Sequence, residues 1–176
     1  MEAPHLGRDA VEELIRRAFA GVTLGKGVSL RQAQVIDRYG DGVTDAEFRA
    51  LPSQEVTNSW PDVPFSELER DCVAHLDPEG FRYYLPALML SLLSSYDTSS
   101  MRVIGTISAL YAKPLHRDHH ERLFGILSDT QRSAVAAFLS SLPQLVDLDA
   151  EDTKRVTRSV ENYWKRYLPT QVVHGS

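Results

Sequence analysis

The stretch DPEGFRYYLPALMLSLL, residues 77–93, decides the fold that we expect for this chain. Asp77 is a good helix N-cap, and Pro78 stands at the first helical position. A residue there makes no intrahelical hydrogen bond with its N–H, so proline, which lacks one, fits well. Because Pro86 removes an internal hydrogen bond, we expect a kink at that residue or two consecutive shorter helices. One apolar face runs along the segment and predicts the core, through Phe81, Tyr84, Leu85, Leu88, Met89, Leu92, Leu93 and Tyr96.

Amphipathic segments with their own start signals precede this central segment. Residues 9–20 carry apolar side chains at helical spacing, and Asp9 followed by Glu12 resembles a capping box. In the irregular connection of residues 52–65, Trp60 is expected to pack on neighbouring helices, because its large apolar surface is unfavourable in water. Three other capped segments predict helices: Ser29 with Gln32 for residues 29–40, Thr44 with Glu47 for residues 44–51, and Ser66 with Glu69 for residues 66–75.

The chain after the central segment also predicts helices. Residues 101–111 have apolar residues at helical spacing, although their β-branched content leaves a strand possible. The second begins with Ser128 and Gln131 as a capping box, and the last begins at Asp149. The expected elements are helices over residues 101–111, 128–142 and 149–167, followed by a frayed tail over residues 169–176.

These segments together predict an all-α fold, an irregular bundle of six or seven helices with a proline-kinked central helix. Hydrophobic residues make up 43% of the chain and charged residues 24%, which is typical of a globular protein. A length of 176 residues fits one ordinary domain. We therefore expect a single helical domain over residues 1–176.

The charge balance argues against a general attraction to nucleic acids or anionic membranes, because the formal net charge is −5. Basic residues gather at Arg16 and Arg17, and again between Lys154 and Arg166, which we interpret as solvated helix faces. The sequence has a single cysteine, shows no signal-peptide pattern and contains no apolar stretch long enough to span a bilayer. We therefore expect a cytoplasmic protein.

Three stretches resemble a bacterial family known as domain of unknown function 6714. They are Trp60 before a capped helix, then LDPEGFRYYLPALMLSLL (residues 76–93), then LSDTQRSAVAAFLSSL (residues 127–142). The run FRYYLPA is the most specific part, and the likeness covers the middle and C-terminal two-thirds of the chain. The resemblance implies the helical fold and carries no activity.

The densest polar cluster is HRDHHER, from His116 to Arg122. On a helix, His116 and His120 would lie one turn apart, as a two-histidine metal site requires, with His119 beside them. The zincin order H-E-x-x-H is absent, because Phe124 stands where its second histidine belongs. Exposed histidines in a charged loop are the simpler interpretation, and a metal site is the alternative.

Two glycine-containing stretches resemble ligand loops only in part. GVTLGKGVS, residues 21–29, lacks the spacing of a phosphate-binding loop, and Gly27 follows Lys26 where that motif has Ser or Thr. DRYGDGVTDAEF, residues 37–48, places Phe48 where a calcium loop has its bidentate glutamate. We expect a loop and helix caps at these positions, and no cofactor.

Cys72 and His75 are three residues apart, near enough on a helix for a nucleophile and its base. Nothing in the sequence supplies an oxyanion site or an orienting acid for such a pair. A buried Cys72 that packs as a small apolar residue is the expected role, and we assign no catalytic residue.

Arg82 and Tyr83 are the candidate partner-binding residues. They are expected to point away from the core face of the central helix, and Tyr with Arg is the composition of binding hot spots. The alternative is that both side chains pack against a neighbouring helix or pair with an acid.

The first functional hypothesis is a cofactor-free protein-interaction module, such as an immunity-type inhibitor or an adaptor. A metal-dependent enzyme using His116, His119 and His120 is the second. The third is a structural homodimer or larger homo-oligomer, formed through the aromatic residues Tyr163, Trp164 and Tyr167 near the C-terminus.

Overall fold

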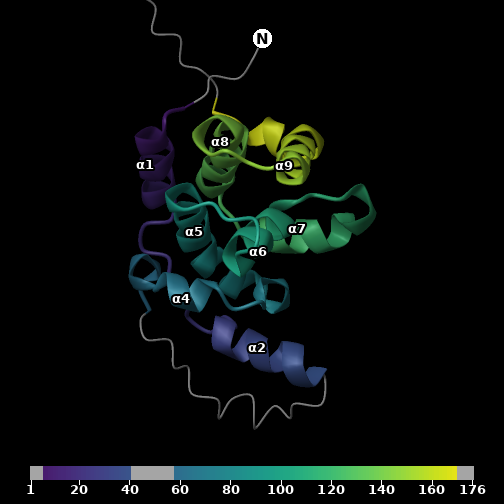
Figure 1. Ribbon diagram of the computed structural model, residues 1–176. Coiled ribbons are helices and arrows are strands. Elements are labelled where there is room, and N and C mark those ends of the chain that lie inside the picture. The colour runs from purple at the N-terminus through teal and green to yellow at the C-terminus, as the bar shows by residue number, and fades with distance from the viewer. Residues whose placement is uncertain (1–5, 41–57, 170–176) are drawn as a thin grey trace, which may run out of the picture.

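The computed structural model describes residues 6–40 and 58–169, where the chain forms helices and connections without strands. The helix expected over residues 44–51 and the calcium-like positions 41–48 lie outside the described residues, as do residues 170–176 of the expected tail. The all-α class is confirmed (Figure 1). The α-helices are α1 (Arg8–Ala18), α2 (Leu30–Tyr39), α4 (Phe65–Leu68), α5 (Pro78–Ser94), α6 (Met101–Leu110), α7 (Arg117–Gly125), α8 (Asp129–Leu145) and α9 (Ala150–Asn162).

Helix α5 is the centre of the core and is buried on almost every side. Asp77 is its N-cap, because its carboxylate accepts a hydrogen bond from the Gly80 N–H at 2.8 Å. The helix continues through Pro86, so the alternative of two shorter helices is wrong, while the kink stays a prediction. No helix in the described ranges combines the length and apolar character that spanning a membrane requires.

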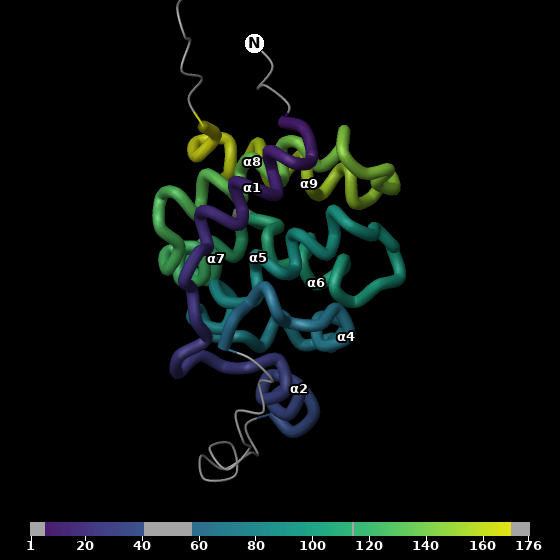
Figure 2. The backbone as a smooth tube through the Cα atoms, turned by 90° about the vertical axis from the view of Figure 1, so that its left-hand side faces the viewer, coloured from purple at the N-terminus to yellow at the C-terminus, as the bar shows by residue number. Residues whose placement is uncertain are grey.

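The other helices pack around α5 and α8. Helix α8 lies between α1 on one side and α9 on the other, while α6 and α7 contact α5 (Figure 1). Helix α2 lies at the far end of the molecule from α8 and α9 in both views (Figure 2). Short 3₁₀ turns complete the described chain: η2 (Trp60–Asp62), η3 (Val73–His75), η4 (Pro114–His116) and η5 (Trp164–Tyr167).

Three of the expected helix starts are confirmed by side-chain caps. Ser29 with Gln32 and Ser128 with Gln131 form complete capping boxes, and the Asp149 carboxylate accepts from the Asp152 N–H. The helix predicted over residues 9–20 is present as α1, but the capping box predicted at Asp9 and Glu12 is wrong, because α1 begins at Arg8 behind Gly7 without a side-chain cap.

The start predicted at Ser66 is also wrong. Helix α4 already begins at Phe65 and ends at Leu68, so Glu69 lies beyond it. The carboxylate of Glu69 instead accepts a hydrogen bond from Ser100 and forms an ion pair with Arg102 at 2.8 Å. A contact with a distant segment has replaced the local capping box.

The C-terminal half departs from expectation in two places. Residues 117–125 form α7 instead of the expected charged loop, and the described residues hold eight α-helices instead of six or seven. The helix expected to reach Tyr167 ends at Asn162, because Tyr163 leaves the helical region with φ −138° and ψ −55°. This break turns Trp164 into the core, where its indole N–H donates to the Leu110 carbonyl at 3.1 Å.

Arginine side chains bind carbonyl groups at helix C-termini, where the last turn leaves acceptors unpaired. Arg8 donates to Leu93 of α5 and to Leu145 of α8. Arg102, which is 7% exposed, donates to Ser91 and Ser95 at the end of the same α5. Arg132 does the same for α7, through the carbonyls of Phe124 and Gly125.

Candidate functional site

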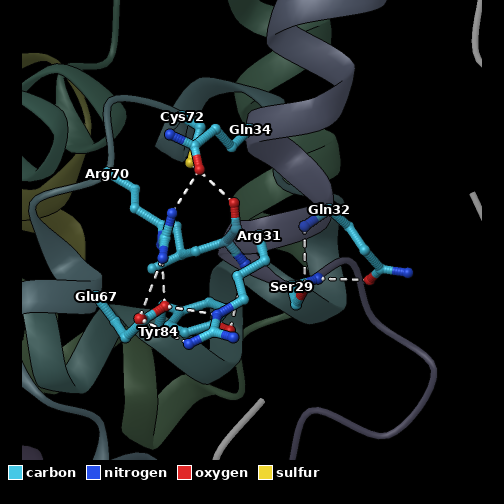
Figure 3. Close-up of polar contacts among 9 residues, drawn as sticks. Ser29, Arg31, Gln32, Gln34, Glu67, Arg70, Cys72 and Tyr84 are labelled. Carbon is cyan, nitrogen blue, oxygen red and sulfur yellow. Dashed lines mark hydrogen bonds and ion pairs between the residues drawn. The ribbon is translucent and has the colours of Figure 1, made fainter. Parts of the chain in front are cut away.

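The polar cluster that joins α2 to α4 is structural (Figure 3). Glu67 accepts hydrogen bonds from Arg31 and Arg70, and these bonds lower the pKa of its carboxyl to about 2. Arg70 also donates to Gln34 of α2. The Glu67 side chain is only 13% exposed, so this charge network holds α2 against the rest of the fold.

Cys72 is buried, as expected, and its thiol donates to the Leu30 carbonyl at 3.1 Å. Burial raises the pKa of that thiol to about 12, so it stays protonated at neutral pH. His75 binds the carboxylate of Asp37 at 2.9 Å. Cys72 and His75 both line a cleft of about 340 Å³, whose walls include Phe81 and Leu123. Because its pKa is raised, the Cys72 thiol in this cleft is not an activated nucleophile.

The histidines of the segment from His116 to Arg122 lie close together in the structure. The ring centroid of His120 is 6.5 Å from that of His116 and 5.8 Å from that of His119. The Nε2 atom of His120 already accepts a hydrogen bond from the Lys113 N–H at 2.9 Å, and its ring stacks on Phe124. Among the described residues no group of three or more His, Cys, Asp or Glu could hold a metal ion.

The predicted orientation of Tyr83 is wrong, because its side chain is fully buried. A helix surrounded on almost every side buries residues on both of its faces, which the sequence pattern of one apolar stripe did not indicate. Arg82 is half-buried, and its Nε atom has no hydrogen-bond partner within residues 6–40 and 58–169. Partner binding by Arg82 stays a prediction, while Tyr83 offers no surface in this structure.

The aromatic residues expected at a homo-oligomer interface pack largely within the chain. Trp164 is fully buried, and its ring lies 4.7 Å from Phe124, between centroids. Tyr163 and Tyr167 are half-buried, and Arg132 lies over the Tyr167 ring. Trp164 is therefore not available to a second copy, and association through the two tyrosines stays a prediction.

Two adjoining clefts along α9 and η5 concentrate positive charge. One has a volume of about 400 Å³ and lies between η5, the end of α9 and α7; the other has about 410 Å³ and lies between α9 and the end of α6. Lys113 lines both, so we call them together the cationic cleft. Its charged side chains are the bases Lys113, Arg117, Lys154, Arg155, Arg158 and Arg166 and the acids Glu121 and Glu151.

Most of this positive charge is not neutralised locally. Arg155 pairs with Glu151 at 3.1 Å, and Arg117 lies 4.0 Å from Glu121. The other four bases form no ion pair within the part of the chain that the structure describes, and all four are exposed. They are Lys113, Lys154, Arg158 and Arg166.

Packing beneath the cationic cleft fixes the segment that carries Lys113. The Ser159 hydroxyl on α9 donates to the Leu110 carbonyl at the end of α6, at 2.5 Å. The same hydroxyl accepts from the Ala112 N–H, and the Trp164 indole reaches the same carbonyl. These buried bonds hold α6 against α9 and place Lys113 between the two parts of the cleft.

Aromatic rings support two of the cations. The Arg166 guanidinium lies 4.9 Å from the Tyr163 ring centroid, and the Lys113 ammonium lies 5.6 Å from that of Tyr111. Both tyrosines are half-buried and line the cationic cleft. Tyrosine beside arginine, which we expected at residues 82 and 83, is thus found at residues 163 and 166.

Sequence reasoning found only part of this site. The sequence shows the basic residues of α9 but favours a solvated face for them, because nothing local connects them to Lys113 or Arg117. The spacing of Lys154, Arg155 and Arg158, within about one helical turn, was the one available signal. The fold brings the remaining residues to them from the end of α6, the segment that follows it, α7 and η5.

The fold and the site define a class of protein: an all-α domain with a cationic cleft whose walls come from separate helices. The chain belongs to a family of unknown function, DUF6714, whose sequence profile matches residues 7–168. The likeness therefore extends into α1, beyond the two-thirds of the chain that carried the resemblance in the sequence. Comparisons with curated proteins and with solved structures found no match.

Proposed function

We propose that this protein is a cofactor-free interaction module that binds an acidic segment of a partner protein in the cationic cleft. The observation that carries the proposal is the separation of charge. A chain with a net charge of −5 gathers six bases and two acids around adjoining clefts. Complementary charge steers association and selects partners, so an acidic segment is the matching occupant.

The same features favour an acidic protein over a nucleic acid. The excess acidic charge on the rest of the molecule repels a long polyanion, whereas a short acidic segment can stay within the cleft. The half-buried Tyr111 and Tyr163 provide apolar contact surface beside Lys113 and Arg166, and tyrosine and arginine dominate protein–protein hot spots. An adaptor or an inhibitor of another protein is consistent with such a surface.

A charge-reversal experiment tests the proposal. The double substitution Lys154→Glu and Arg158→Glu changes two exposed residues of α9, away from the core. We expect it to weaken binding of a fluorescently labelled polyglutamate peptide by about tenfold or more in fluorescence anisotropy. The wild-type affinity is expected to fall as salt is added, because exposed charges are screened.

The matched control is the double substitution Arg16→Glu and Arg17→Glu on α1, which lies across α8 from α9 (Figure 1). It changes the net charge by the same amount and is expected to leave the affinity within about twofold. An equal loss in both double variants, or no binding of polyglutamate by the wild type, would refute the proposal. Tighter binding of a single-stranded oligonucleotide than of polyglutamate would assign the cleft to nucleic acid instead.

A further inference from the structure

The part of the cationic cleft between α9 and the end of α6 has bases on both of its walls. Lys154, Arg155 and Arg158 lie on the α9 wall, and Lys113 lies on the opposite wall. The acid of this part, Glu151, already pairs with Arg155 at 3.1 Å. The other three bases form no ion pair within residues 6–40 and 58–169, so a group that enters here meets three cations without a counter-charge.

The bases of α9 lie on the same side of the helix. Lys154 and Arg158 are four residues apart, Arg155 and Arg158 are three apart, and all of them line the cleft. Like charges at these spacings are neighbours on a helix surface and weaken it by repulsion. An anion bound between them would relieve that repulsion, which the single acid Glu151 relieves only for Arg155.

The wall that carries Lys113 is fixed through its backbone. The N–H of Lys113 donates to Nε2 of His120 at 2.9 Å, and its carbonyl accepts the N–H of His116 at 3.0 Å. The preceding residue, Ala112, donates its N–H to the Ser159 hydroxyl of α9. Little of this wall has to become ordered when a ligand binds, which favours affinity.

Three cations without a counter-charge match a phosphate monoester better than a carboxylate. At neutral pH a phosphorylated side chain carries a charge of about −1.5 to −2 and three acceptor oxygens, whereas a carboxylate has one charge and two oxygens. The guanidinium of Arg158 has the planar geometry that binds two phosphate oxygens in parallel. Lys113 and Lys154 add ammonium donors, and the exposed Ser108 adds a hydroxyl.

We propose that this part of the cleft receives a phosphorylated side chain of the partner's acidic segment, bound by Lys113, Lys154 and Arg158. The inference rests on the proposed function, because it names the group that the acidic segment presents between α9 and α6. It adds regulation: phosphorylation of the partner raises its affinity for the cleft.

Two labelled peptides of nearly equal net charge test the proposal on the unmodified protein. Both carry flanking glutamates, and the centre is one phosphoserine in the first peptide and two glutamates in the second. We expect the phosphoserine peptide to bind about tenfold more tightly in fluorescence anisotropy, because the phosphate accepts more charge-assisted hydrogen bonds. Equal affinity of the two peptides overturns the proposal.

A substitution that keeps the charge tests the role of Arg158. Arg158→Lys loses the paired donors of the guanidinium and is expected to reduce the preference for phosphoserine about threefold or more. Binding of the two-glutamate peptide should stay within about twofold of the wild type, since the charge is retained. Both Arg158 and the control position Arg166 are exposed, so neither variant disturbs the core.

The matched control is Arg166→Lys, which makes the same change in the other part of the cleft. It should leave the preference for phosphoserine unchanged. An equal loss of preference in both variants, or no loss in Arg158→Lys, overturns the assignment of the phosphate to the part between α9 and α6.

Inorganic phosphate identifies the source of the phosphate group. We expect it to displace the phosphoserine peptide only at about 100-fold higher concentration or more, because it lacks the acidic residues that flank the phosphoserine. Inorganic phosphate that binds as tightly as the peptide would assign the site to a free anion and overturn the proposal.

Failure of this inference is distinguishable from failure of the proposed function. If the two peptides bind equally and the Lys154 and Arg158 double variant loses both, only the phosphate is wrong. If neither peptide binds to the wild type, the acidic partner is wrong as well.

Discussion

At the scale of single residues, Gly80 allows the chain before α2 to cross the start of α5. The carboxylate of Asp77 accepts the N–H groups of both Gly80 and Val28, each at 2.8 Å, so one acceptor joins the two segments. A Cβ atom at Gly80 would lie 2.2 Å from the Val28 carbonyl oxygen. Only a residue without a side chain fits this crossing.

Gly80→Ala is therefore expected to destabilise the protein by about 2 kcal/mol, within the usual range for overpacking, despite the better helix propensity of alanine. Thermal unfolding followed by circular dichroism measures the change. Gly125→Ala is the matched control, because its Cβ meets no atom within 4 Å. That control should gain about 0.5 kcal/mol. A Gly80→Ala variant as stable as the wild type would contradict the crossing.

At the scale of elements, α2 is attached through charge as well as through apolar contact. Glu67 binds two arginines, and both of them are partly exposed, at 33% for Arg31 and 28% for Arg70. Because the folded pKa of Glu67 is depressed from 4.5 to about 2, its contribution to stability is present above pH 4.5. It is lost as the pH falls from 4.5 through about 2, where the carboxylate becomes protonated in the folded state.

Glu67→Gln is expected to reduce the free energy of unfolding at pH 7 by about 1–2 kcal/mol, after allowance for solvent screening of the exposed arginines. Near the folded pKa of about 2 most of the difference between variant and wild type should vanish. Urea unfolding at the two pH values measures this. The exposed Glu161→Gln serves as the control and should differ little at either pH. A penalty for Glu67→Gln that does not change with pH would exclude the ionic role.

At the scale of the whole molecule, the two tryptophans are buried in different parts of one core. The Trp60 indole donates to the Phe19 carbonyl beside α1, and the Trp164 indole donates to the Leu110 carbonyl between α6 and α9. Both side chains belong to the same continuous apolar cluster. A core without a break predicts that the two regions unfold together.

Single-tryptophan variants test this expectation. Trp60→Phe leaves Trp164 as the only fluorescent tryptophan, and Trp164→Phe leaves Trp60. In each variant, the urea midpoint from fluorescence is expected to coincide with the midpoint from circular dichroism, as a single cooperative domain requires. Separate midpoints within one variant would indicate two units and would contradict the single domain over residues 1–176.

The sequence predicted those parts of the fold that depend on local signals. The start of α5 at Asp77 and the capping boxes of α2 and α8 rest on residues three apart, and they are confirmed. The break at Tyr163 was not predictable, because it is fixed by contacts with α6 and α8 that are distant in the chain. The burial of Tyr83 was missed because helices surround α5.

The candidate site was harder to predict than the fold. The charges on α9 were visible in the sequence, and so was His120, but their proximity was not. The backbone N–H of Lys113 donates to Nε2 of His120, and this bond ties the segment after α6 to α7. Lys113 and His120 are seven residues apart, on either side of the junction of η4 and α7. No periodicity of the sequence predicts a contact across such a junction.

The arginine that binds the ends of α5 and α8 has a consequence for the order in which the chain is completed during synthesis. Arg8 leaves the ribosome well before its acceptors on Leu93 and Leu145, which follow 85 and 137 residues later. Helix α1 can therefore take its final place only when most of the chain has emerged. Until then the apolar face of α1 is not covered by α8, which makes the nascent helix a natural client for a chaperone.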